Sequence, residues 1–290
     1  MMAIQGTVMS DKIYFNTSNK FSFKRSLIGA TTNLHYILAP SHAKKTARKL
    51  LLTPMRTEQK NADPQGLIKS EIKGRDGVLK TYSLGTGPVW VLTHGWSGTA
   101  SQFFPLMEHI AAKGFTAMAY DHPAHGGSDG VHGHIPAFVN GLEAILDSVG
   151  EVAGLVGHSM GTASALECKH VKLENKPLLL IAPVLDYLEN LFGSVARSGY
   201  SMKLFEAVVG EVEEQFNYPI QSVDPYGKLA LRESQTIIVH DEQDKFTKFD
   251  VSKRAAYEMD LVTLIATQGQ GHGRVMKCPQ VFESFDNLIG

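Results

Sequence analysis

A serine between two glycines is the residue of this chain best placed for nucleophilic chemistry. Ser159 lies in the segment Gly157-His158-Ser159-Met160-Gly161, which follows an apolar run over 152–156 and precedes small, helix-favouring residues. This G-x-S-x-G pattern is typical of a tight turn from a strand into a helix, which exposes the serine Oγ at the end of a sheet. The alternative is an ordinary glycine-rich turn with a buried or capping serine. To distinguish a nucleophilic serine from a structural one, the sequence must also contain the other residues that the chemistry needs.

A serine hydroxyl becomes a nucleophile when a base takes its proton and an acid fixes the base. His272 is the candidate base, because it follows the last predicted strand and has a glycine on either side. Asp244 is the candidate acid, in the loop after a predicted strand over 236–240, and Asp241 is its rival at the strand end itself. We prefer Asp244 because its position in the loop gives it more reach. The chain order Ser159, Asp244, His272 is that expected for a triad on an open α/β sheet.

Acyl chemistry also needs N–H donors for the oxygen that becomes negatively charged. We expect these donors to be the main-chain N–H groups of Met160, directly after the serine, and of Trp96, in the loop after strand 89–93. For the Trp96 ring, the alternative is a plain packing role. We expect His94 to order this loop and His158 to point beneath the serine turn, and we place His94, Gly95 and His158 at the substrate site. Three further histidines near strand ends are expected to have structural roles: His122, His125 and His240.

The predicted elements place these residues at one edge of a sheet. Apolar or alternating runs predict strands over 67–73, 78–84, 89–93, 115–120, 152–156, 177–182, 236–240 and 261–266. Helices are predicted over 101–113, 135–149 and 279–288, and directly after the serine. Strands and helices alternate from residue 88 to 182, which is typical of a parallel sheet with right-handed crossovers. Open α/β sheets hold their sites at the carboxyl ends of such strands.

Residues 186–233 interrupt this alternation. No strand is evident there, and Leu204, Val208, Val212 and Phe216 recur every fourth residue with glutamates between them, which predicts an amphipathic helix. We predict a small helical lid over 186–233, with Val208 and Val212 facing an acyl substrate. The alternative is a pair of ordinary connecting helices.

Residues 1–60 predict an N-terminal extension with one short basic helix. Residues 1–40 show no clear periodicity, whereas Ser41 resembles an N-cap for a helix that continues through Leu51. This helix contains four basic residues, Lys44, Lys45, Arg48 and Lys49. It suits a membrane surface or a partner protein. Because its apolar face is small, we prefer the alternative that the apolar stripe docks on the protein while the basic face lies in solvent. The core would then comprise residues 61–185 and 234–290.

Composition narrows the class of protein further. The 290 residues are 43 % hydrophobic and 20 % charged, with a formal net charge of −1. This balance suits a globular enzyme and gives no sign of a nucleic-acid partner. No apolar run approaches membrane-spanning length, the first residues lack a secretory signal, and the two cysteines, Cys168 and Cys278, lack metal-ligand spacing. We therefore expect a cytoplasmic location with reduced thiols, although one disulfide stays possible.

Taken together and in this order, the segments resemble the α/β-hydrolase superfamily, and within it the carboxylesterase and lysophospholipase-like branch with a small lid. The resemblance covers roughly residues 65–290 and rests on five segments: 94–98, 121–128, 157–161, 239–244 and 271–274. The chain departs from the family pattern at Ala124, where glycine is common, and at Asp241, where glycine often follows the histidine of the acid strand. The resemblance implies an α/β-hydrolase fold with a mostly parallel sheet.

The resemblance also implies hydrolysis of a small-molecule carboxylic ester through an acyl-Ser159 intermediate, with no metal or organic cofactor. An acyltransferase or thioesterase acting on carrier-bound acyl groups is the runner-up, because the same acyl-enzyme would serve it. A non-catalytic, hydrolase-like binding protein is a third possibility, which a missing triad member would favour. Neither the natural substrate nor the oligomeric state can be deduced from the sequence.

Overall fold

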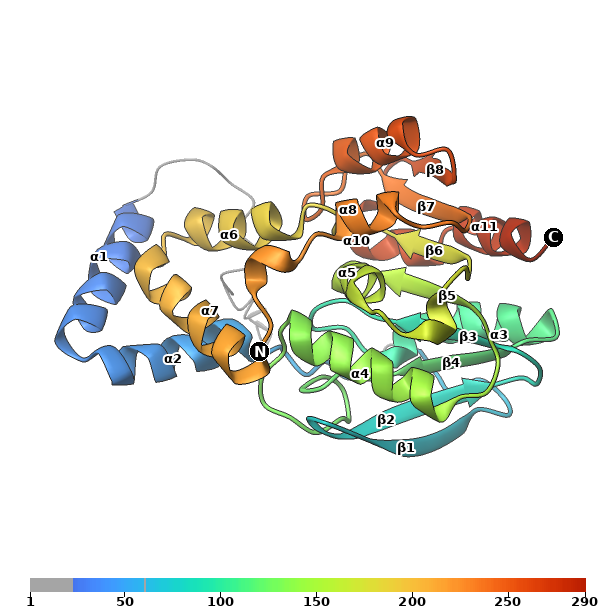
Figure 1. Ribbon diagram of the computed structural model, residues 1–290, viewed down its shortest axis with the longest axis horizontal. Helices are drawn as coiled ribbons and strands as arrows, with labels where there is room; N and C mark the ends of the chain where they lie inside the picture. The colour runs from blue at the N-terminus through green and yellow to red at the C-terminus, as the bar shows by residue number, and fades with distance from the viewer. Residues whose placement is uncertain (1–22, 60) are drawn as a thin grey trace, which may run out of the picture.

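One mixed sheet of eight strands organises the computed structural model, which describes residues 23–59 and 61–290 (Figure 1). The strand order is β1-β2-β4-β3-β5-β6-β7-β8. The strands are β1 Ile68–Gly74, β2 Gly77–Leu84, β3 Val89–Thr93, β4 Thr116–Tyr120, β5 Val152–His158, β6 Leu178–Ile181, β7 Thr236–Asp241 and β8 Val262–Thr267. The hairpin β1–β2 and the pair β2–β4 are antiparallel, and every pair from β4 to β8 is parallel. The predicted, mostly parallel α/β sheet is thereby confirmed.

The strand order reverses at the centre of this sheet. From β3 the chain moves outward to β4 and then returns to place β5 on the other side of β3. The loops after β3 and β5 therefore diverge and leave a crevice at the carboxyl ends of the strands, where open α/β sheets bind their ligands. Ser159 directly follows β5, so it lies at this crevice.

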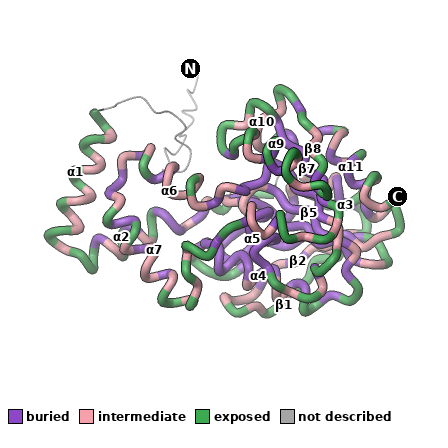
Figure 2. The backbone as a smooth tube through the Cα atoms, turned by 45° about the horizontal axis from the view of Figure 1, so that its top comes forward, coloured by how far each residue is buried: buried purple, intermediate pink, exposed green. Residues whose placement is uncertain are grey.

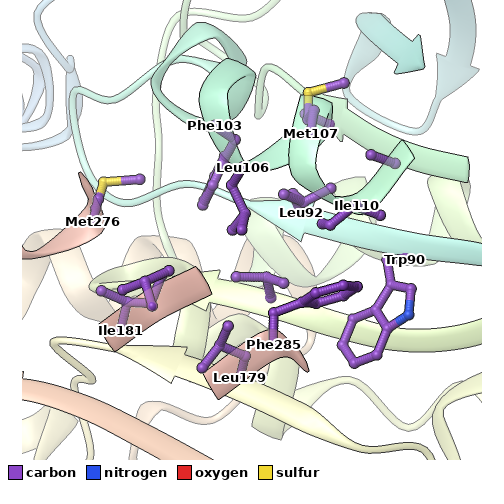
Figure 3. Close-up of a cluster of buried hydrophobic side chains, with 14 of the residues drawn as sticks. Trp90, Leu92, Phe103, Leu106, Met107, Ile110, Leu179, Ile181, Met276 and Phe285 are labelled. Atoms are coloured by element: carbon purple, nitrogen blue, oxygen red, sulfur yellow. The ribbon is translucent and has the colours of Figure 1, made fainter. Parts of the chain in front are cut away.

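Helices cover both faces of the sheet because the central strands are apolar on both sides. One face is covered by α3 Phe104–Ala112 and α11 Pro279–Ile289, and the other by α4 Ile135–Ser148, α5 Met160–Glu167, α8 Pro225–Ala230 and α9 Phe249–Glu258. Along β3, Trp90 and Leu92 point to the first layer, whereas Val89 and Val91 point to the second. Figure 3 shows Trp90 against Phe285 in the first layer, with ring centroids 4.9 Å apart.

A helical unit lies beyond the carboxyl edge of the sheet (Figure 1). It combines α6 Tyr187–Ser198 and α7 Met202–Phe216, inserted between β6 and β7, with the N-terminal helices α1 Phe23–Leu38 and α2 Pro40–Leu52. A shared apolar cluster joins them, in which Ala43, Ala47 and Leu51 of α2 pack with Leu204 and Val208 of α7. In Figure 2, α2 and α7 contain buried segments, while α1 at the outer edge is exposed or half-buried.

The structure differs from the expectations for the N-terminal extension in two ways. The basic helix begins at Pro40 with Ala39 as its N-cap, rather than with Ser41, because proline is well suited to the first helical position. A second helix, α1, precedes it over residues that lack a single clear apolar period. The alternative of a docked apolar stripe holds for α2, since its buried residues face α7.

Two smaller observations concern the membrane and the cysteines. In the described ranges, no helix combines the length and the apolar character needed to cross a bilayer. Cys168 and Cys278 are both buried free thiols, so they do not form the disulfide that the sequence left possible. Burial raises the pKa of the Cys168 thiol to about 12.

Candidate active site

Ser159 occupies a strained turn between β5 and α5. Its φ of 52° and ψ of −125° lie outside the regions that non-glycine residues prefer, so the surrounding structure must hold it there. The Ser159 N–H donates to the carbonyl of Ile181 (3.1 Å), and the Ser159 carbonyl accepts from the Thr162 hydroxyl (2.5 Å). Steric contacts explain why glycine lies on both sides of this turn. A Cβ on Gly161 would lie 2.3 Å from the Thr93 carbonyl oxygen, and one on Gly157 would lie 3.1 Å from Cα of Thr162.

A chain of hydrogen bonds joins Ser159, His272 and Asp244. His272 Nε2 lies 2.9 Å from Ser159 Oγ, and His272 Nδ1 lies 2.7 Å from Asp244 Oδ2. His272 belongs to the short helix α10 Gly271–Arg274, which follows β8, and Asp244 belongs to the loop after β7. Three strand ends thus bring together the three side chains that the sequence proposes as nucleophile, base and acid. With Nδ1–H donated to the carboxylate, Nε2 is left to accept the serine proton.

Asp244 is a fully buried carboxylate with a complete set of donors. Oδ1 accepts from the N–H groups of Phe246 (2.7 Å) and Thr247 (3.2 Å), and Oδ2 also accepts from the Thr247 hydroxyl (2.8 Å). His240 Nε2 lies 3.3 Å from Oδ2. Burial by itself raises the pKa of Asp244, but the hydrogen bonds from His240 and His272 outweigh it and hold the pKa well below its usual value. The Asp244 carboxylate is therefore ionised, and its negative charge can stabilise a positive charge on His272.

Asp241, the rival acid, does not contact the His272 ring. Its Oδ2 accepts from the Thr267 hydroxyl (2.9 Å) and the Gln270 N–H (2.8 Å), and its Oδ1 accepts from the Gln243 N–H (3.0 Å). Burial raises the pKa of Asp241, but hydrogen bonds from Gln270 and its neighbours lower it below the ordinary value. Asp241 thus ties the loop that carries His272 to the end of β7.

The loop after β3 approaches the serine from the opposite side. A Cβ on Gly95 would lie 2.7 Å from Cβ of Ser159, so only glycine allows this approach. Trp96 follows Gly95. Met160 is the first residue of α5, and N–H groups in the first turn of a helix have no acceptor within the helix. Trp96 and Met160 both border the cavity described below. His94 holds the loop: its Nδ1 donates to the Gly95 carbonyl (2.7 Å), and its Nε2 accepts the His122 N–H (3.1 Å).

His94, Gly95 and His158, which we place at the substrate site, lie beside Ser159 but are not among the residues that line this cavity. His94 is completely buried, and burial lowers its pKa. His158 lies under the turn, where its Nε2 donates to the His272 carbonyl (3.0 Å). Burial lowers the pKa of His158 to about 3, so it stays neutral. The two histidines hydrogen-bond to the backbone beside Ser159, at Gly95, His122 and His272.

A cavity of about 360 Å³ lies between Ser159 and His272 on one side and the helical insertion on the other. Its walls are mainly apolar. The insertion contributes Tyr187, Leu191, Phe205, Val208, Val209 and Val212, and the rest of the chain contributes Leu52, Trp96, Ile135, Met160 and Val184. Three charged side chains also border it: Arg197, Glu213 and Lys245.

The apolar stripe expected on α7 divides between two neighbours. Val208 and Val212 line the cavity and also belong to the cluster with α2, whereas Leu204 belongs to that cluster alone. The Phe216 ring lies against His134, with centroids 4.4 Å apart. Phe205 lies one position away from the stripe but lines the cavity. The helix is apolar on more than one face because it separates α2 from the cavity.

Polar contacts attach the insertion to the loop that carries Asp244. The Asn190 side-chain amide of α6 donates to the Phe246 carbonyl (2.6 Å). Lys248 forms an ion pair with Asp186 (3.5 Å) and another with Glu189. The first helix of the insertion is therefore fastened beside the mouth of the cavity.

The histidines that the sequence assigned to structural roles are buried behind the site. His122 stacks on Phe138 with centroids 3.8 Å apart, and its Nε2 lies 2.6 Å from the Thr93 hydroxyl. Burial lowers the pKa of His125 to about 3. No group of three or more His, Cys, Asp or Glu side chains in the described ranges is arranged to hold a metal ion. Ala124, where the family pattern has glycine, adopts a left-handed φ of 68°.

Several residues that the sequence did not single out contribute to the site. Thr247 supports Asp244 through its hydroxyl and its N–H, and the Phe246 ring lies 5.2 Å from the His272 ring. The spacing from Asp244 to Thr247 is a signal that could have been used, because a short polar side chain three residues after an aspartate often closes a turn. Phe205 gave no such signal, because its role depends on how α7 is seated.

Comparison with known proteins identifies the fold. The model of the Alpha/beta hydrolase family matches residues 90–284. No curated protein matches the sequence significantly. Among solved structures, the chain is similar to the esterase Est1E from Butyrivibrio proteoclasticus with ferulic acid bound, at 15 % identity and a TM-score of 0.61, covering 76 % of this chain and 99 % of that one.

Two further structures show the same likeness. One is the Pyrococcus furiosus esterase Pf2001, with 18 % identity, a TM-score of 0.60, and coverage of 82 % of this chain and 96 % of that one. The other is a thioesterase domain from the curacin biosynthetic pathway, with 16 % identity, a TM-score of 0.56, and coverage of 78 % and 100 %. At these identities the likeness establishes the fold. Since the family model covers two thirds of its length, the chain belongs to the Alpha/beta hydrolase family.

Proposed function

We propose that this protein is a serine hydrolase that cleaves carboxylic esters through an acyl-Ser159 intermediate. The observation that carries the proposal is the pair of contacts made by His272, 2.9 Å to Ser159 Oγ and 2.7 Å to Asp244 Oδ2, beside an apolar cavity. This is the geometry in which a histidine can take the serine proton while a carboxylate stabilises the resulting imidazolium.

The reaction follows from this arrangement. Ser159 Oγ attacks the ester carbonyl carbon as His272 Nε2 takes its proton, and the carbonyl oxygen becomes an oxyanion facing the N–H groups of Trp96 and Met160. When this intermediate collapses, the C–O bond to the alcohol breaks and His272 returns the proton to the leaving oxygen. Water then attacks the acyl-enzyme with His272 as base, and the acid leaves as Ser159 recovers its proton.

The apolar cavity supports an ester with an aliphatic or aromatic acyl group. Each additional CH₂ buried there contributes about 0.8 kcal/mol, so kcat/KM should rise roughly fourfold per CH₂ until the cavity is filled. We propose residues 186–233 as the lid of this site, since Phe205, Val208 and Val212 form one of its walls. The hydrolase core then comprises residues 61–185 and 234–290, with residues 1–60 as an extension.

Thioester hydrolysis or acyl transfer is the second candidate. The same acyl-Ser159 intermediate would serve it, and a thioesterase domain shares the fold. Only the leaving group or the acceptor would differ.

The test is a series of nitrophenyl esters from acetate to octanoate, measured beside acyl-thioesters of the same chain lengths. Hydrolysis should disappear in Ser159→Ala, and an organophosphonate should modify one serine, located in the peptide that contains Ser159. A matched control is Ser148→Ala, because this exposed serine lies at the end of α4. Full esterase activity after stoichiometric labelling of Ser159 would refute the mechanism. No turnover of any ester or thioester would favour a binding protein.

Val208→Asp tests the acyl wall separately. It should depress kcat/KM for octanoate more than for acetate, because the longer chain contacts more of α7. A melting curve is needed to show that the variant is folded. Equal losses for both esters in a folded variant would remove α7 from the acyl site and leave the triad assignment untouched.

A further inference from the structure

The outward face of α1 exposes several large apolar side chains. None of the 16 residues of α1 is buried. Five large apolar side chains of this helix are exposed: Phe23 77 %, Leu27 53 %, Leu34 54 %, Ile37 67 % and Leu38 74 %. Their spacing places them on one side of the helix, with Ala30 among them. We call these six residues the outer face of α1.

The opposite side of α1 already accounts for its attachment to the protein. Ile28 and Tyr36 pack against the cluster shared with α2 and α7, and the Thr32 hydroxyl accepts the Ser201 N–H (3.0 Å). The outer face therefore has no part in holding the helix in place. A helix that is apolar on two sides, with one side exposed, marks an interaction surface.

The charge of the two N-terminal helices is entirely positive. Residues 23–52 contain six lysines and arginines and no aspartate or glutamate, so their formal net charge is +6. The whole chain carries −1, and the other 260 residues therefore carry −7. Lys44 and Arg48 pair with Glu211 of α7 (2.7 and 4.0 Å), whereas Lys45 and Lys49 are exposed on α2.

From this combination we propose that α1 and α2 form a docking surface for a bilayer that contains anionic lipid. An exposed apolar helix face inserts at the boundary between headgroups and acyl chains, and neighbouring lysines are attracted to the anionic headgroups. A second copy of this chain fits less well. A symmetric pairing would bring together two surfaces of like charge, and neither α1 nor α2 holds a carboxylate to pair with the basic residues of the other copy.

Docking in this way would bring the bilayer close to the acyl cavity. Leu52, the last residue of α2, lines the cavity, and α7, which packs against α2, contributes Phe205 and Val208 to its wall. This consequence rests on the proposed function: an ester drawn from the bilayer would be near the lid. The docking itself does not depend on catalysis, so we test it with the full-length Ser159→Ala protein.

The experiment is flotation with vesicles of phosphatidylcholine alone and of equal parts phosphatidylcholine and phosphatidylglycerol. Binding should require the anionic lipid and should weaken strongly between about 50 mM and about 500 mM NaCl. Lys45→Ala with Lys49→Ala should weaken binding about 25-fold, roughly fivefold per lysine. Leu27→Ser with Leu34→Ser should weaken it at least about tenfold.

Matched controls are the exposed residues Lys169 and Lys253, changed together to Ala, and the exposed Leu231, changed to Ser. They should leave binding unchanged. In a Ser159-containing background all these variants should hydrolyse a short soluble ester normally, which shows that they fold and separates this proposal from the proposed function.

Three results would overturn the proposal. The first is that the chain binds neither kind of vesicle. This result would exclude the bilayer as the occupant of the outer face, whichever other partner covers it. The second is equal binding to neutral and anionic vesicles or binding that ignores the lysine changes. The third is a dimer in light scattering that Leu27→Ser with Leu34→Ser dissociates, without vesicle binding, since a second copy would then be the occupant.

Discussion

Replacing Asp244 by asparagine should disable the enzyme by changing the tautomer of His272. Oδ1 of Asp244 accepts two backbone N–H groups, from Phe246 and Thr247, whereas Oδ2 faces His272 Nδ1. An amide nitrogen in the first position would leave two buried N–H donors without an acceptor, which costs about 1–3 kcal/mol each. The amide nitrogen should therefore take the second position and donate to His272 Nδ1. His272 Nε2 would then carry the proton and could no longer accept one from the serine.

The size of this loss is set by the proton transfer. A wrong histidine tautomer in a serine triad costs about 10⁴-fold in kcat, or roughly 5 kcal/mol of transition-state stabilisation. The assay is steady-state hydrolysis of nitrophenyl butyrate, with a melting curve for each variant. The ¹⁵N shifts of His272 report the tautomer directly and would not change if Asp244 were merely structural.

Asp241→Asn is the matched control, because both carboxylates are buried and lie three residues apart at the carboxyl end of β7. Asparagine at this position can keep its oxygen toward Thr267 and Gln270 and lose only the bond from the Gln243 N–H. We expect about 1–3 kcal/mol of lost stability and less than about a tenfold loss of kcat. An inactive Asp241→Asn protein together with a nearly normal Asp244→Asn protein would refute the assignment of the acid.

Three further changes test the surroundings of the triad. Gly95→Ala should lower kcat/KM about 100-fold or more without unfolding the protein, because the new Cβ would lie 2.7 Å from Cβ of Ser159; normal activity would contradict the close approach of this loop. Thr247→Val should lower kcat about tenfold by removing one hydrogen bond to Asp244, and an unchanged kcat in a folded variant would show that the bond is dispensable. Burial lowers the pKa of His134 to about 3, below the roughly 6.5 of an unfolded chain, so acid favours the unfolded state. The free energy of unfolding in urea should therefore fall between about pH 7.5 and about pH 5.5, and His134→Asn, which keeps the N-cap acceptor of α4, should remove about 1 kcal/mol of that fall; the same fall in this variant would exclude His134 as a cause.

The order of strands and helices could be predicted from local patterns. The apolar run before Ser159 and the small residues after it favour a strand and a helix on their own, and Asp76-Gly77 predicts the hairpin between β1 and β2. Local patterns did not predict α1, because it carries apolar residues on two faces and a single helical period of apolar residues does not describe it. The outer face of α1 was recognised only from the exposed fractions of its side chains in the structure.

The sequence by itself determined which residues have the chemistry for acyl transfer, and in which order they occur. That follows from local physics, because a serine between glycines at a strand end and a histidine in a glycine-rich loop need no distant partner to be recognised. Tertiary structure alone decided which neighbour each side chain meets. Asp241 ends β7 and Asp244 follows three residues later, yet one accepts a hydrogen bond from the backbone of the histidine loop and the other contacts the His272 ring. The position of α7 between α2 and the cavity likewise selects Phe205 over Leu204 for its wall. Such choices depend on long-range packing, which no local pattern contains.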